Sequence, residues 1–226
     1  MAIISQETMQ KILNFAYTTA INGVEVPGLP DFASAYKLAE DYKKQYPNDL
    51  AKQIDSLINW QCTKAGLSGA MTGLGGFLTM TVTLPANITS VIIIQLRMIA
   101  TIAILCGYDV KNDKVQTLIY CCLVKQSIEN VIKGTGVKIA QKFGVKLIQR
   151  IPGDVIKIIN KAVGFRLITK FGQKGFINLG KAVPLFGAAL GATIDVLSTK
   201  SIGTFTKKML MAEDTKQNFI ETEFVC

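Results

Sequence analysis

Few residues in this chain have the chemistry that catalysis usually requires. The 226 residues include no histidine, so no Ser-His or Cys-His pair can form, and the commonest ligand of zinc and iron is absent. The cysteines show no CxxC spacing, and most lie in apolar stretches, where a thiol usually packs as a small hydrophobic group. They are Cys62, Cys106, Cys121, Cys122 and Cys226. We therefore expect no metal site, no cofactor and a non-catalytic function.

Cationic side chains are concentrated in one segment of the chain. Residues 133–181 contain eleven Lys or Arg and one acid, Asp154, which gives +10, while the net charge of the whole chain is +9. Within this segment residues 144–150 (GVKLIQR) are similar to residues 164–170 (GFRLITK), and Pro152-Gly153 separates the two copies. This near-repeat predicts a pair of short basic amphipathic helices.

Four of these cations recur every four residues and predict a cationic ridge along one helix. A basic helix with an apolar opposite side is typical of a membrane-surface element, because its cations contact anionic headgroups. Two alternatives stay open, a solvated face over a protein core and a nucleic-acid surface. Nucleic acid is disfavoured because the phenylalanines lie on the apolar side and do not alternate with the cations. The candidate membrane-binding residues are Lys138, Lys142, Lys146, Arg150, Lys157, Lys161, Arg166, Lys170 and Lys174.

Two opposite charges stand alone in separate apolar stretches. Arg97 is the only charge in residues 86–105, and Asp195 is the only charge in residues 182–197. An ion in an apolar setting is usually paired, because an unpaired one costs several kcal/mol. We predict that Arg97 and Asp195 form a buried polar pair that fixes helix register, with Gln95 and Asp109 as rival partners for Arg97. The alternative is a point that binds a polar ligand in an apolar cavity.

Helical periodicity runs through almost the whole sequence and predicts an all-α fold. We expect a single helical domain over residues 1–210. Residues 1–48 would form N-terminal amphipathic helices, residues 49–210 the core, and residues 211–226 a polar C-terminal tail.

The helix boundaries follow from cap and breaker residues. The first helix is expected over residues 1–20, and a second from an N-cap at Asp31 to about Tyr46. A third would begin near Asp49, after Pro47 and Asn48. A connecting helix is expected over residues 113–133.

A long uncharged stretch predicts an apolar helical hairpin. Residues 65–96 contain no charge, and Pro85 divides the region into a Gly-rich half, 66–84, and an Ile-rich half, 86–105. Each half approaches the ~20 residues that cross a bilayer core. Burial in a protein core and insertion in lipid both stay open. Small residues at four-residue spacing allow close helix packing, and the candidate packing residues are Gly69, Gly73, Gly187 and Gly191.

Several landmarks together resemble a known family. Leu84-Pro85, then residues 95–103 (QLRMIATIA), then residues 107–109 (GYD) are similar in order and spacing to the EcsC family of bacterial proteins. The resemblance covers about residues 51–207 and includes Gly187 and Gly191. It implies a helical protein associated with membranes or membrane transport, and it supplies no catalytic residues.

The favoured function is association with anionic membrane lipids or modulation of a membrane protein. An odd number of cysteines and the absence of a signal-peptide pattern favour a reducing compartment. We therefore expect a cytoplasmic protein, peripheral to or partly inserted in the inner face of a membrane. Two alternatives stay open, a soluble carrier of a lipid or other hydrophobic ligand and a histidine-independent enzyme acting on lipids.

Overall fold

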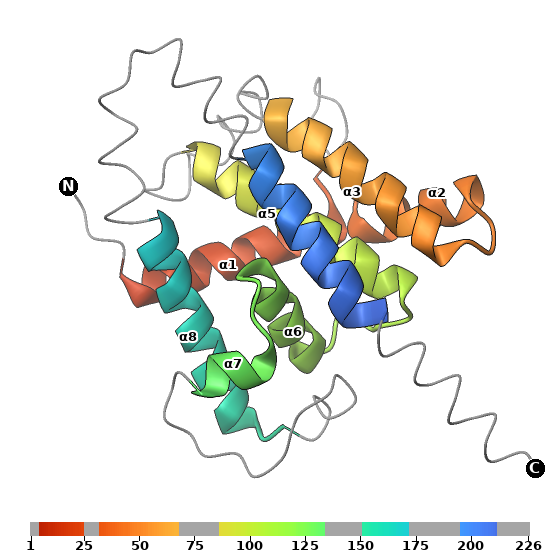
Figure 1. Ribbon diagram of the computed structural model, residues 1–226. Coiled ribbons are helices and arrows are strands. Elements are labelled where there is room, and N and C mark those ends of the chain that lie inside the picture. Colours follow the sequence, from red (N-terminus) through yellow and green to blue (C-terminus); the bar gives the residue numbers. More distant parts are fainter. Residues whose placement is uncertain (1–4, 25–31, 68–85, 134–150, 172–194, 212–226) are drawn as a thin grey trace, which may run out of the picture.

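The described residues of this protein are helical. The computed structural model describes residues 5–24, 32–67, 86–133, 151–171 and 195–211 (Figure 1). These ranges contain helices, turns and an isolated β-bridge between Val24 and Phe32, but no strand. The predicted all-α class is confirmed, and a single helical domain fits this arrangement.

Serine caps start the first two helices. α1 (Gln6–Asn22) begins after Ser5, whose side chain accepts from the backbone N–H of Thr8. α2 (Ala35–Gln45) begins after Ser34, whose side chain accepts from the backbone N–H of the third residue of that helix. The predicted N-cap at Asp31 is wrong, because Ser34, which is also a favoured N-cap type, takes that role.

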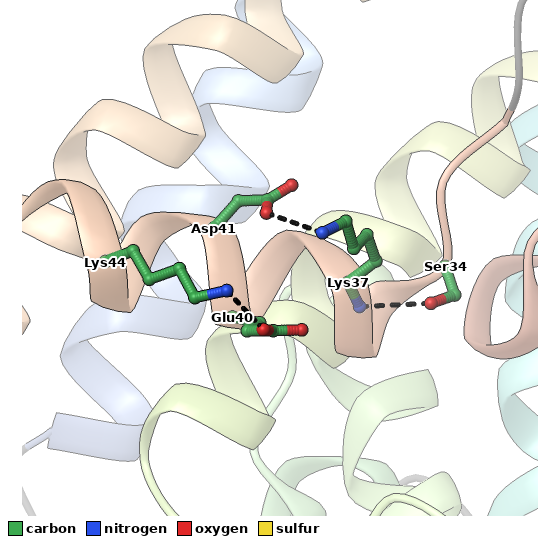
Figure 2. A network of polar contacts seen from close by, with 5 residues as sticks. All are labelled: Ser34, Lys37, Glu40, Asp41 and Lys44. Carbon is green, nitrogen blue, oxygen red and sulfur yellow. Dashed lines mark hydrogen bonds and ion pairs between the residues drawn. The ribbon is translucent and has the colours of Figure 1, made fainter.

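The outward face of α2 is charged. Lys37 contacts Asp41 at 3.1 Å and Lys44 contacts Glu40, both one helical turn apart (Figure 2). Such exposed pairs contribute about 0.2–0.5 kcal/mol each. The opposite face of α2, which includes Leu38, is buried, so packing rather than surface charge holds this helix in place.

The core is built around α5 (Ala86–Leu105), which packs against α1, α2, α3 (Leu50–Leu67) and α6 (Asp113–Leu123). From position 91 to position 105 its side chains are buried, with Ile104 half-buried. This half of the predicted hairpin therefore lies within the protein. Residues 68–85 are outside the described part, so the hairpin itself stays a prediction. In the described ranges, no helix is long and apolar enough to cross a membrane.

The predicted connecting helix is interrupted. α6 ends at Leu123, Lys125 has a φ of 51°, and α7 (Ile128–Lys133) follows. A left-handed residue cannot continue an α-helix, so the continuous helix expected over residues 113–133 is wrong.

The last described helix covers residues 195–211 and lies along α5 (blue in Figure 1). Gln95 Nε2 donates to Thr199 Oγ1 at 3.2 Å, which joins the two helices. A Cβ on Gly203 would lie 2.8 Å from Ile58 Cγ1, so this helix also packs closely on α3.

Candidate functional site

The described part of the predicted basic surface lies on α8 (Gly153–Phe171). This helix contacts α1, α6 and α7. Its inner side is fixed by Ile159, Val163 and Leu167, all fully buried. The exposed residues recur on the other side, where Lys157 and Lys161 lie.

Two large apolar side chains share this outward face. Phe165 is 55% exposed and Ile158 is 36% exposed. Residues three or four positions apart occupy one helix face, so Ile158, Lys161 and Phe165 form a continuous stripe. We call Lys157, Ile158, Lys161 and Phe165 the α8 face. The sequence predicted the lysines of this face, but it placed the phenylalanines on the opposite, apolar side of the basic helices, whereas Phe165 is exposed beside the lysines.

α8 also differs from the predicted short helix. It has 19 residues, and the second copy of the near-repeat lies in its interior. Gly164 therefore begins no helix, and a Cβ there would lie 2.6 Å from Gln10 Nε2 of α1. Arg166 is partly buried beside the α8 face. The side chains of the remaining predicted cations lie outside the described residues, namely Lys138, Lys142, Lys146, Arg150, Lys170 and Lys174.

A second polar centre surrounds Arg97 of α5, whose side chain is 1% exposed. Its guanidinium donates to the Ala33 carbonyl at 3.2 Å and to Gln61 Oε1 of α3 at 3.1 Å. The Phe32 ring lies 3.7 Å from its central carbon, which is cation–π distance. Burial lowers the pKa of Arg97 to about 10, so the side chain is still charged at pH 7.

This centre keeps unused donors. Arg97 Nε and Gln61 Nε2 are buried without a hydrogen-bond partner among the described residues. Burial and the nearby Arg97 charge both lower the pKa of Lys64. The region therefore carries net positive potential, because the described hydrogen bonds and ring contact of Arg97 are all with neutral groups.

Gln95 and Arg97 point in different directions. Residues two positions apart on a helix lie about 200° apart, so the contact of Gln95 with Thr199 directs Arg97 away from the helix of residues 195–211. Asp195 begins the described part of that helix and is partly buried. The predicted Arg97–Asp195 pair stays a prediction that these contacts do not support.

One protein family matches most of this chain. The model of the EcsC protein family matches residues 3–211 of the 226. The chain belongs to the EcsC family. No curated protein and no solved structure matches it. The match takes in α1 and α2, which precede the range 51–207 inferred from the sequence landmarks.

The EcsC-like landmarks of α5 have structural roles here. Gly107 has a φ of 82° and follows the helix end, where Tyr108 N–H donates to the Ala103 carbonyl at 2.9 Å. This bond and the one from Gly107 N–H to the Ile104 carbonyl form a Schellman cap. The Gly-Tyr-Asp landmark therefore ends the central helix, and the Leu-Arg landmark supplies its buried cation.

Reactive groups are sparse in the described part of this EcsC chain. Burial raises the pKa of the Cys122 thiol to about 12 and that of Cys121 still further, so neither is a nucleophile at neutral pH. In the described ranges, no group of three or more Cys, Asp or Glu could hold a metal ion. The predicted packing residues Gly69, Gly73, Gly187 and Gly191 lie outside those ranges.

Proposed function

We propose that this EcsC protein associates with anionic membrane surfaces through the α8 face. The proposal rests on Phe165, which is exposed on the same face of α8 as Lys161. Large apolar side chains on a surface are unfavourable in water, and cations next to them match anionic headgroups. The α8 face lies within the segment of residues 133–181 that carries a net charge of +10.

The energetics of such a contact combine two modest terms. Each cation near an anionic surface contributes about 1 kcal/mol, and transfer of a phenylalanine side chain out of water contributes roughly 1.5–3 kcal/mol when it is fully buried. Together, two lysines, Ile158 and Phe165 provide reversible binding rather than permanent insertion. The proposed location is therefore the membrane surface, with the protein peripheral to it. The proposed partners are anionic lipids.

The test is co-sedimentation with phosphatidylserine–phosphatidylcholine vesicles. Phe165→Ala should weaken binding by about 10-fold or more, because the variant loses most of the apolar term. Its thermal unfolding should change little, because Phe165 is exposed.

Trp60→Ala is the matched control. Trp60 of α3 is 50% exposed, and Lys64 Nζ lies 5.4 Å from its ring, so this pair has the same chemistry on another helix. Its removal should leave vesicle binding unchanged. Equal losses in both variants, or no loss in Phe165→Ala, would contradict the α8 face as the binding surface.

A further inference from the structure

A groove of about 650 Å³ lies between α1, α6 and α8. Amide side chains supply much of its lining, and they come from all three helices: Gln6, Gln10, Asn14, Gln116 and Asn160. Amides both donate and accept hydrogen bonds, so a groove of this composition matches ligands with several hydroxyl groups. None of these residues was singled out by the sequence, because each is an ordinary polar residue within its own helix.

Several of these amides are held in place by the protein. Gln10 Nε2 donates to the backbone carbonyl of Asn160 at 2.7 Å. Gln116 Nε2 donates to the Tyr120 hydroxyl at 2.9 Å, and that hydroxyl contacts Asn14 Oδ1 at 3.2 Å. Positioned polar groups cost less to order when a ligand binds than free side chains do.

Asn160, which lines the groove, has an unused acceptor. Asn160 Oδ1 is buried and has no hydrogen-bond partner in the part of the chain that the structure describes. A buried acceptor without a partner is unfavourable, and a turn of the half-buried Asn160 side chain toward the groove would let a ligand hydroxyl satisfy it. This atom favours a ligand that donates hydrogen bonds over a bare anion.

The groove also carries balanced charges. Lys157 and Lys161 of α8 line it, as do Glu7 of α1 and Asp113 of α6. Each acid lies in the first turn of its helix, where the helix dipole stabilises a carboxylate, and Glu7 also pairs with Lys11 at 2.8 Å. The two lysines are therefore the groups available to an anionic part of a ligand.

We propose that this groove binds a phosphorylated polyol. The hydroxyl groups would contact the amides and the acids, and the phosphate would contact Lys157 and Lys161. The ligand could come from solution as a sugar or glycerol phosphate, or from a membrane as a lipid headgroup. Because both lysines also belong to the α8 face, the headgroup case rests on the proposed function.

The first experiment titrates the whole 226-residue chain with glycerol 3-phosphate, inorganic phosphate and phosphoethanolamine in a calorimeter. Glycerol 3-phosphate should bind at least 10-fold more tightly than the other two, because only it offers hydroxyl groups together with phosphate. Equal affinities for the three probes, or no binding of glycerol 3-phosphate, would overturn the proposal.

Asn160→Leu separates binding from folding. It should weaken glycerol 3-phosphate binding about 10-fold, because the ligand loses an acceptor in the groove. Its melting temperature should stay the same or rise, because Oδ1 bonds to nothing in the described protein. A large drop in melting temperature would assign Asn160 a structural role and contradict the unused-acceptor argument. Asn59→Leu on the exposed side of α3 is the matched control and should change neither quantity.

Vesicles then distinguish the two sources of the ligand. Phosphatidylglycerol and phosphatidylserine carry the same net charge, but only the first has a polyol headgroup. If the protein binds phosphatidylglycerol vesicles more tightly than phosphatidylserine vesicles, and Asn160→Leu abolishes this preference, the ligand of the groove is a lipid headgroup. If the protein binds both kinds of vesicle equally and also binds glycerol 3-phosphate, the ligand of the groove comes from solution. If the protein binds vesicles but not glycerol 3-phosphate, the groove does not bind a phosphorylated polyol, and the proposed function still holds. If it binds glycerol 3-phosphate but no vesicles, only the proposed function is wrong.

Discussion

Arg97 is accommodated in the core by a backbone carbonyl, an amide oxygen and an aromatic ring, with no carboxylate among these contacts. Removing an ion from water costs several kcal/mol, and the lowered pKa of Arg97 reflects mainly this loss of solvation. The Phe32 ring and two hydrogen bonds offset part of the cost. Because Nε and the Gln61 amide nitrogen stay without partners in the described protein, the solvation lost on burial is incompletely replaced.

Substitutions of Gln61 should show that the solvation of Arg97 is incompletely replaced in the core. Gln61→Glu would place a carboxylate against the guanidinium and remove the unused amide N–H. We expect stability to be unchanged or raised by up to ~2 kcal/mol, whereas Gln61→Leu should lower it by roughly 1.5–3 kcal/mol by deleting a hydrogen bond to a charged group. Urea unfolding at pH 7 measures both.

Gln53→Glu is the matched control for this prediction. Gln53 is also buried on α3, but its Nε2 donates to the Tyr46 carbonyl at 2.8 Å. A carboxylate there would face another acceptor, so this variant should be less stable than the wild type. If Gln61→Glu is destabilised as much as Gln53→Glu, the positive potential assigned to the Arg97 centre is wrong.

The sequence pointed to Arg97 but not to its partners. A lone charge in an apolar helix is conspicuous, whereas Gln61 and Phe32 come from distant parts of the chain. One signal for Gln61 was present, because it follows Ile54 and Leu57 on the buried stripe of α3. A polar residue within an apolar helical stripe is a candidate contact for a buried charge.

The helix of residues 195–211 depends on a close approach at Gly203. Its Cβ position lies 2.8–3.1 Å from three atoms of Ile58, which is buried and β-branched and therefore cannot easily move aside. Gly203→Ala should thus lower stability by about 1–2 kcal/mol, because overpacking outweighs the gain in helix propensity. Thermal unfolding provides the measurement.

Gly153→Ala at the start of α8 is the control, since no atom lies within 4 Å of its Cβ position. It should leave the unfolding midpoint unchanged or slightly higher. An equal or higher midpoint for Gly203→Ala would show that the helix can move away from α3 at no cost, which would contradict the close packing.

Helix positions were more predictable than helix boundaries. Apolar periodicity correctly placed α5 at residues 86–105, and the Pro-Asn-Asp breaker correctly placed the start of α3. The start of α2 was missed because Asp31 and Ser34 are both good caps, and local sequence does not choose between them. The break at Lys125 was missed because it contains no Gly or Pro to mark it.

Charge is distributed unevenly over the whole molecule. The chain has a net charge of +9, and the segment of residues 133–181 alone carries +10, so the remainder is close to neutral. A membrane could be attracted by the overall charge or by this segment in particular. The two cases differ at moderate salt, because the Debye length of about 10 Å at 0.1 M limits attraction to cations near the surface.

Two charge-reversal variants with the same net charge separate these cases. One replaces four cations of the predicted ridge with Glu, and their structure lies outside the described residues: Lys138, Lys142, Lys146 and Arg150. The other replaces four exposed lysines of other helices and turns with Glu: Lys43, Lys52, Lys111 and Lys208. Each reversal lowers the net charge by two, so the net charge of both variants falls from +9 to +1.

We expect the ridge variant to lose co-sedimentation with phosphatidylserine vesicles at about 0.1 M salt, because its reversed charges would lie against the headgroups. The control variant should retain most of its binding, since its reversed charges lie on helices and turns outside the basic segment. Equal loss in the two variants would mean that net charge alone drives association. In that case the basic segment has no directing role, and the +10 of residues 133–181 would serve another purpose, such as a solvated face over the protein core.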